Sequence, residues 1–172
     1  MAGRILNKAL QSKVMSAEAA AALIPNGATI GMSGFTGAGY PKAVPIALSK
    51  RALDERLAGK PLRFNVLTGA STGPEQDTVM SIVDAQRFRF PYQGDAATRE
   101  KINTGLMEYQ DMHLSHAGSL VRHGHYGKVD FALIEVTKIN EDGTAVPSSS
   151  CGNNNVYLEH AEKIILEVNS WQ

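Results

Sequence analysis

Apolar and polar positions alternate along the chain in short blocks that predict strands and helices in succession. Apolar residues at helical spacing predict helices over residues 5–10, 17–24, 41–57, 76–85, 96–103 and 109–122. Short β-prone runs predict strands at 28–33, 63–67, 88–90, 131–136 and 163–168. The last two runs are almost continuously apolar, as in parallel strands covered on both faces. The pattern therefore predicts a single α/β domain over residues 1–172, with an open, mostly parallel sheet and helices on both faces.

Composition narrows the class of protein. Of the 172 residues, 43% are apolar and 20% are charged, which is ordinary for a globular chain. The 17 basic and 17 acidic side chains cancel, and no basic cluster favours a nucleic-acid partner. No apolar run approaches the roughly 18 residues of a membrane helix, and the first residues lack a secretory signal. The single cysteine suits a reducing compartment, so we expect a cytoplasmic protein without a membrane partner.

Two glycine-rich segments share one design. Residues 34–39 and 68–73 each follow a predicted strand and precede a predicted helix. In open α/β sheets, ligands bind at the carboxyl ends of the strands, where glycines let the backbone approach a ligand closely. The helix that follows would present free N–H groups and its positive dipole end to an anion. We interpret both segments as ligand-binding loops, and the alternative is that they are only tight connections.

The second loop also resembles the cofactor loop of short-chain dehydrogenases. Those enzymes need a tyrosine followed four residues later by a lysine, which lowers the tyrosine pKa. None of the five tyrosines is followed at that spacing by a lysine, and Pro74 stands where that family continues Ile-Gly. The dehydrogenase interpretation is therefore set aside.

The first loop carries a more informative motif. Residues 26–41 read Asn-Gly-Ala-Thr-Ile-Gly-Met-Ser-Gly-Phe-Thr-Gly-Ala-Gly-Tyr-Pro. This segment resembles the N-terminal signature of class I coenzyme A transferases, with Gly31 interrupting the apolar run and Ser33 replacing the first Gly of a Gly-Gly-Phe triplet. Similarity to the acetyl-CoA hydrolase/transferase branch extends, in order and spacing, over residues 67–74, 126–128, 132–137, 141–143, 147–153 and 161–169. One departure lies at Gly94, where relatives tend to carry a threonine.

The resemblance implies an enzyme that moves coenzyme A between short-chain acyl-CoA and a carboxylate. In this family a glutamate attacks the thioester, and an acyl-glutamyl anhydride and then a glutamyl-CoA thioester follow. If water intercepts an intermediate, the same site hydrolyses acyl-CoA. The nucleophilic glutamate lies in a second, C-terminal domain, and this chain stops at Gln172, where relatives continue. We therefore expect the N-terminal half of a two-domain, homo-oligomeric CoA-transferase, inactive alone and with no catalytic residue of its own.

By the same resemblance, this half forms one wall of the acyl pocket and shields the anhydride from water. The implied substrate-binding residues are Gly34, Phe35, Thr36, Gly37, Ala38 and Gly39 in the first loop, Thr68, Gly69, Ala70 and Ser71 in the second, and Ser149, Gly152 and Asn153 in a third. The resemblance implies no metal and no permanently bound cofactor, since coenzyme A is a substrate. The alternative functions are a non-catalytic CoA- or anion-binding module, or a separate subunit of a two-chain transferase.

Three other features could carry chemistry. Glu135 lies inside an apolar strand, and we favour a structural carboxylate, paired with a cation or with amides, over a nucleophile. Four histidines lie close in sequence, but a zinc site needs three or four converging ligands, so we favour packing or solvated roles for His113, His116, His123 and His125. Cys151 has no matched histidine or helix N-terminus in the predicted elements, so we expect it to be structural.

Overall fold

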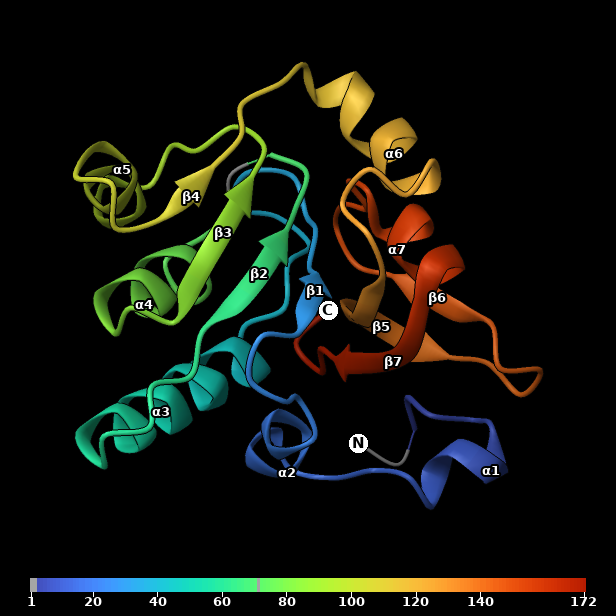
Figure 1. Ribbon diagram of the computed structural model, residues 1–172. Coiled ribbons are helices and arrows are strands. Elements are labelled where there is room, and N and C mark those ends of the chain that lie inside the picture. Colours follow the sequence, from blue (N-terminus) through green and yellow to red (C-terminus); the bar gives the residue numbers. More distant parts are fainter. Residues whose placement is uncertain (1–2, 71) are drawn as a thin grey trace.

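One seven-stranded sheet forms the centre of the computed structural model, which describes residues 3–70 and 72–172 (Figure 1). The strand order is β4-β3-β2-β1-β5-β6, and β7 also pairs with β5. All pairings are parallel except that of β5 with β6. The strands are β1 (Thr29–Gly31), β2 (Phe64–Leu67), β3 (Gln86–Phe90), β4 (Glu108–Tyr109), β5 (Val129–Ile139), β6 (Ala145–Pro147) and β7 (Ala161–Val168).

Helices cover both faces of this sheet. They are α1 (Lys8–Gln11), α2 (Ala17–Ala22), α3 (Ala43–Leu57), α4 (Asp77–Ile82), α5 (Ala96–Asn103), α6 (Leu114–Arg122) and α7 (Asn154–His160). Residues of α2, α3 and α4 share one apolar core with Phe131 and Leu133 of β5. Residues of α6 and α7 share a second core with Ala132 and Ile134 (Figure 1). Because successive residues of β5 enter opposite cores, both of its faces are covered, and the expected α/β class with a mostly parallel sheet is confirmed.

The structure corrects two predicted helices. The helix expected over 109–122 begins only at Leu114, because Glu108 and Tyr109 pair with β3 as a short strand. The helix expected over 5–10 is reduced to α1, because Ile5 forms a bridge with Ile139 of β5.

Besides β4, two elements have no counterpart among the predicted ones. Strand β6 has three residues and ends in a proline, and α7 opens with a run of asparagines. Neither stretch shows the periodicity from which the other elements were predicted. No helix in the described part of the chain is both long enough and apolar enough to cross a membrane.

The parallel pairing of β1, β2 and β3 places the segments that follow these strands at one edge of the sheet. Strands β1, β2 and β3 are neighbours that point the same way, so the segments that follow them leave from one edge of the sheet. We name these segments loop 1 (residues 32–42) and loop 2 (the described residues 68–70 and 72–76). The segment before α7, loop 3 (residues 148–153), reaches the same edge, where the backbone N–H of Asn153 donates to the hydroxyl of Ser33.

Candidate functional site at the carboxyl edge of the sheet

Loops 1, 2 and 3 are joined by hydrogen bonds. The Ser33 hydroxyl accepts the Asn153 backbone N–H at 2.8 Å, and the Asn153 side-chain amide donates to the Thr68 carbonyl oxygen at 3.2 Å. The hydroxyl of Tyr157, in α7, donates to the same carbonyl oxygen. Further out, the Ser150 hydroxyl donates to the Ala38 carbonyl oxygen at 2.6 Å. The three segments that the sequence singled out are therefore neighbours in space.

Glycine is required where loop 3 meets loop 1. Gly152 has φ +50°, and a Cβ there would collide with the Ser33 hydroxyl and the Gly34 carbonyl oxygen. A Cβ on Gly69 would lie 2.9 Å from the same hydroxyl oxygen. Side chains at these two positions would push the loops apart, because a backbone this close to its neighbour has no room for them.

The tip of loop 1 points outward. Phe35 and Ala38 exchange backbone hydrogen bonds of 2.9 and 3.1 Å, which leaves Thr36 and Gly37 as a two-residue turn. Thr36 has φ +50°, a conformation that a β-branched residue rarely adopts. The Phe35 side chain is 53% exposed. Loop 1 therefore presents a strained turn and an aromatic ring to its surroundings.

The remaining predicted site residues fall into two groups. Gly34, Gly39, Thr68, Gly69, Ala70 and Asn153 are buried or half-buried at the junction, whereas Ser149 is exposed. Ser71 lies outside the described residues.

The N-terminus of α3 is already occupied by a carboxylate of the chain itself. Glu167, near the end of β7, accepts the backbone N–H groups of Lys42, Ala43 and Val44 at 2.6, 3.0 and 2.9 Å. The positive end of the helix dipole is thereby neutralised internally. The expectation that the helix after loop 1 offers free N–H groups to an anion is wrong, because Glu167, 125 residues further on, takes them.

Glu135 has the cationic partner that a structural carboxylate needs. Its side chain is 1% exposed and accepts a hydrogen bond of 2.6 Å from the Lys42 ammonium group. Lys42 also donates to the Tyr40 carbonyl oxygen and lies over the Tyr40 ring. The pair fastens the end of loop 1 to β5.

Tyr40 links loop 1 to loop 2. Its hydroxyl donates to the carboxylate of Glu75, and its ring packs against Gly73. Burial raises the pKa of the Tyr40 hydroxyl, and the bond to Glu75 raises it further. The same hydrogen bond lowers the pKa of Glu75, so the carboxylate stays ionised as the acceptor.

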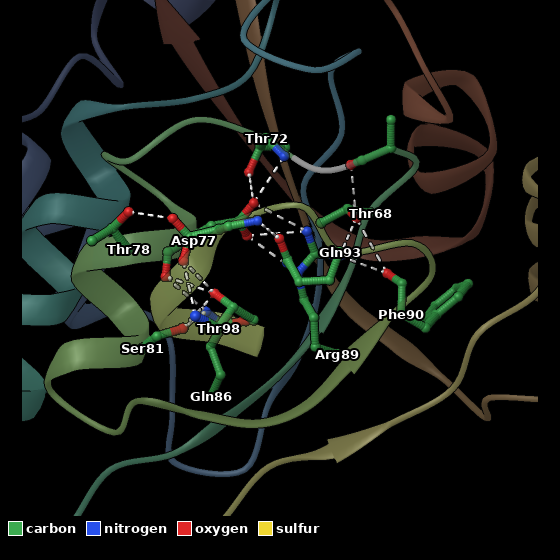
Figure 2. A network of polar contacts seen from close by, with 12 residues as sticks. Thr68, Thr72, Asp77, Thr78, Ser81, Gln86, Arg89, Phe90, Gln93 and Thr98 are labelled. Atoms are coloured by element: carbon green, nitrogen blue, oxygen red, sulfur yellow. Dashed lines mark hydrogen bonds and ion pairs between the residues drawn. The ribbon is translucent and has the colours of Figure 1, made fainter. Parts of the chain in front are cut away.

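Beneath loop 2 lies a buried ion pair that the sequence analysis missed (Figure 2). The side chains of Asp77 and Arg89 are both fully buried, and Arg89 donates to the Asp77 carboxylate at 3.0 and 3.2 Å. Arg89 also donates to the Thr68 hydroxyl, and Asp77 accepts both the N–H and the hydroxyl of Thr72. The alternation in Gln-Arg-Phe-Arg-Phe was a weak signal, because it is equally typical of a strand with its arginines in solvent.

The histidines and the cysteine offer little further chemistry. His113 forms the N-cap of α6, and its ring meets that of His116 edge-on. Within the described ranges, no group of three or more His, Cys, Asp or Glu side chains could hold a metal ion. Cys151 is exposed and lies just before α7, so a helix N-terminus is near it after all, although that helix has only seven residues.

Comparison with solved structures shows which known fold the chain shares. The chain is similar to glutaconate coenzyme A-transferase from Acidaminococcus fermentans, with a TM-score of 0.66 and 14% identity over 90% of this chain and 68% of that one. It is also similar to RipA from Yersinia pestis, with a TM-score of 0.72 and 20% identity over 96% of this chain and 38% of that one. The fold is therefore that of a coenzyme A-transferase domain.

Sequence comparison identifies the family. The model of the acetyl-CoA hydrolase/transferase N-terminal domain matches residues 4–172, so the chain belongs to that family. Succinyl-CoA:acetate CoA-transferase of Clostridium kluyveri is 42% identical over 98% of this chain and 31% of its own length. Propanoyl-CoA:succinate CoA transferase of Escherichia coli is 40% identical over 91% of this chain and 32% of its own. Acetyl-CoA hydrolase of Saccharomyces cerevisiae is 39% identical over 92% of this chain and 31% of its own length.

The chain spans about a third of the length of these relatives. The family expected from the motif in residues 26–41 is confirmed.

Proposed function

We propose that this chain is the N-terminal domain of an acyl-CoA:carboxylate CoA-transferase or acetyl-CoA hydrolase, and that loops 1, 2 and 3 form one wall of its acyl pocket. The observation that carries the proposal is that three segments bearing the family's motifs meet at the carboxyl edge of the sheet. In open α/β folds this edge is where ligands bind.

The chemistry divides between this domain and a second, C-terminal one. In the proposed reaction, a glutamate of the second domain attacks the thioester carbonyl, the C–S bond breaks, and coenzyme A leaves as a thiolate. The thiolate then attacks the glutamyl carbonyl of the anhydride, which releases the first carboxylate and leaves a glutamyl-CoA thioester. The acceptor carboxylate attacks this thioester and expels the thiolate, which then attacks the acceptor carbonyl of the new anhydride and releases the glutamate. Water that reaches an intermediate makes the reaction a hydrolysis. We expect the complete enzyme to be a cytoplasmic homo-oligomer.

This chain would contribute shape and exclusion of water. Gly34 and Gly69 are buried, and a side chain at Gly34, Gly69 or Gly152 would collide with neighbouring loop atoms, so these glycines support the shape of the wall. The exposed tip, with Phe35 and the strained Thr36, is the part free to touch substrate or the second domain. An apolar ring at this position would exclude water from the anhydride intermediate. Exclusion of water is the main role proposed for this wall of the pocket.

The test compares the full-length protein with the 172-residue chain. Succinyl-CoA or acetyl-CoA is supplied with acetate or succinate, and both CoA transfer and free thiol release are measured. We expect turnover by the full-length protein only. In that protein, Phe35→Ala should lower kcat/KM by about tenfold and raise the share of hydrolysis. Leu57→Ala, at an exposed site near the end of α3, is the control and should change neither.

Three results would count against the proposal. Full-length protein that consumes no CoA thioester would remove the enzymatic function. A Phe35→Ala variant with unchanged partition between transfer and hydrolysis would remove the tip from the acyl pocket. Coenzyme A binding by the isolated chain at the affinity of the full-length protein, without turnover in either, would favour the alternative of a non-catalytic binding module.

A further inference from the structure

We infer that Asp77 and Arg89 are a positioning pair that fixes Thr68 and Thr72 of loop 2 in the positions they take at the carboxyl edge. Only its consequence for turnover rests on the proposed function. The pair contacts loop 2 at two described residues, Thr68 on one side and Thr72 on the other (Figure 2).

The contacts at the two ends differ in kind. At the first end, the Arg89 guanidinium donates to the Thr68 hydroxyl and, at 2.9 Å, to the Phe90 carbonyl oxygen. At the second end, the Asp77 carboxylate accepts the Thr72 backbone N–H at 2.8 Å and its hydroxyl at 2.9 Å. The ion pair connects Arg89 to Asp77, so Thr68 and Thr72 are linked by a continuous series of hydrogen bonds.

The backbone of Asp77 is itself held by hydrogen bonds. The Asp77 carbonyl oxygen accepts hydrogen bonds of 3.3 Å from the Gln86 amide and from the Thr98 hydroxyl. The Ser81 and Thr98 hydroxyls lie 2.7 Å apart, which joins α4 to α5 (Figure 2). A binding loop supported by a second layer of hydrogen bonds keeps its geometry to within a fraction of an ångström.

Stability alone does not account for the pair. Replacing a buried ion pair by apolar side chains of similar volume is often neutral or even stabilising, since two charges no longer have to be dehydrated. Apolar side chains cannot, however, accept the Thr72 N–H or donate to the Thr68 hydroxyl. What the pair adds over an apolar core is therefore the placement of the loop backbone.

This contrast provides the experiment. The double variant Asp77→Leu/Arg89→Met removes both charges at once, so neither is left buried without its partner. In the 172-residue chain, we expect it to melt within about 4 °C of the wild type. Hydrogen exchange of the Thr72 amide should nevertheless accelerate by about tenfold or more, because its acceptor is gone. Asp84→Asn, which removes a half-exposed carboxylate next to Arg63 and Arg56, is the control and should leave this exchange rate unchanged.

The full-length protein gives the functional readout. There the double variant should lower kcat by about tenfold with a smaller change in KM, because a displaced wall misplaces the reacting groups more than it weakens binding. If the wild-type full-length protein does not turn over CoA thioesters, the proposed function fails, while the exchange measurement still decides the role of the pair.

Arg89→Lys covers the case in which the double variant does not fold. Lysine keeps the charge but lacks the planar fork that reaches Asp77 and Thr68 together. We expect this variant to fold and to accelerate Thr72 exchange by about threefold or more. If the double variant folds and its Thr72 amide exchanges at the wild-type rate, the inference is overturned. If the double variant does not fold, the same result in Arg89→Lys overturns it.

Discussion

Gly152 lies at one of the contacts between loops 1 and 3, beside the hydrogen bond from Ser150 to Ala38. Its backbone lies against the Ser33 hydroxyl and the Gly34 carbonyl oxygen, and its φ of +50° disfavours any side chain. The next residue, Asn153, donates its backbone N–H to the Ser33 hydroxyl, so a shift of the backbone at Gly152 would break this hydrogen bond.

Gly152→Ala should therefore lower the free energy of unfolding by about 1–3 kcal/mol, the usual cost of overpacking a tight site. Urea denaturation measures the effect. Gly37→Ala is the matched control, because Gly37 lies in the same cluster of loops but a Cβ there meets nothing within 4 Å. Equal losses in the two variants would contradict the close contact described here.

At the scale of single residues, the sequence predicted the glycines better than their partners. Gly34 and Gly69 stand out because glycine just after a predicted strand has a local explanation, whereas Gly152 was singled out only through the family resemblance of residues 147–153. Asp77 and Glu167 do not stand out, since an acidic residue in a helix or a strand is ordinary until its partner is known. The partners of Glu167 begin 125 residues earlier, at Lys42, and no local pattern connects them.

Helix α3 is the element whose start is set from outside. Glu167 supplies a full negative charge to three of its N-terminal N–H groups. Glu167→Gln keeps the size of the side chain and an acceptor oxygen but removes the charge. We expect it to lower the free energy of unfolding by about 1–2 kcal/mol, as for other charged groups at helix ends.

Thermal or urea unfolding of Glu167→Gln measures this loss. Glu162→Gln is the control on the same strand, because Glu162 makes an exposed ion pair with Lys128 and such pairs contribute little. A smaller loss in Glu167→Gln than in Glu162→Gln would refute the role given to Glu167.

Helix α5 is capped by its own N-terminal neighbour. Asp95 accepts the Thr98 backbone N–H at 2.9 Å and the hydroxyls of Thr98 and Thr78. Burial alone would raise the pKa of Asp95, but these hydrogen bonds outweigh burial and lower it. A carboxyl with a lowered pKa stabilises the folded state above its unfolded value of about 3.9, and this stabilisation is lost as the pH falls through the folded value.

The wild type should therefore be more stable than Asp95→Asn at pH 6, and the gap should narrow as the pH falls from about 5 to 2. Urea denaturation across this range gives the comparison. Asp54→Asn, at an exposed position of α3, controls for loss of an acidic charge. A gap between wild type and Asp95→Asn that is constant with pH would show that Asp95 caps the helix without its charge.

At the scale of elements, the long periodic segments were predictable and the short ones were not. Helix α3 and the apolar run in β5 follow directly from their patterns. Strand β4 has only two residues and exists because β3 offers an open edge, so tertiary pairing overrode the helical pattern over 109–122.

Across the whole molecule, β7 is a long strand none of whose residues is fully buried. It pairs with β5, and the described residues provide no strand for its other edge. A groove of about 590 Å³ runs beside it, lined largely by apolar side chains that include Val14, Leu23 and Ile164. Ile164 itself is 51% exposed. A long strand with an unpaired edge and exposed apolar side chains is a site at which another chain can pair.

The 172-residue chain should therefore associate as its concentration rises, and Ile164→Lys should suppress this, because charges on an edge oppose strand pairing. Sedimentation velocity over a range of concentrations follows the association. Leu57→Lys, at a more exposed apolar site near the end of α3, is the control. Association that is equally weakened by both variants would assign it to general hydrophobicity rather than to the β7 edge.

The distances along the chain that separate loop 1 from its anchors have a consequence for biosynthesis. The hydrogen bond of Ser33 cannot form until Asn153, 120 residues later, has been synthesised. That of the Lys42 backbone N–H requires Glu167, 125 residues later. At ordinary rates of translation these anchors leave the ribosome roughly 6–25 s after the loop they secure. Loop 1 is therefore made well before its contacts with Asn153 and Glu167 can form, and during that interval only nearer contacts, such as that of Tyr40 with Glu75, are available to hold it.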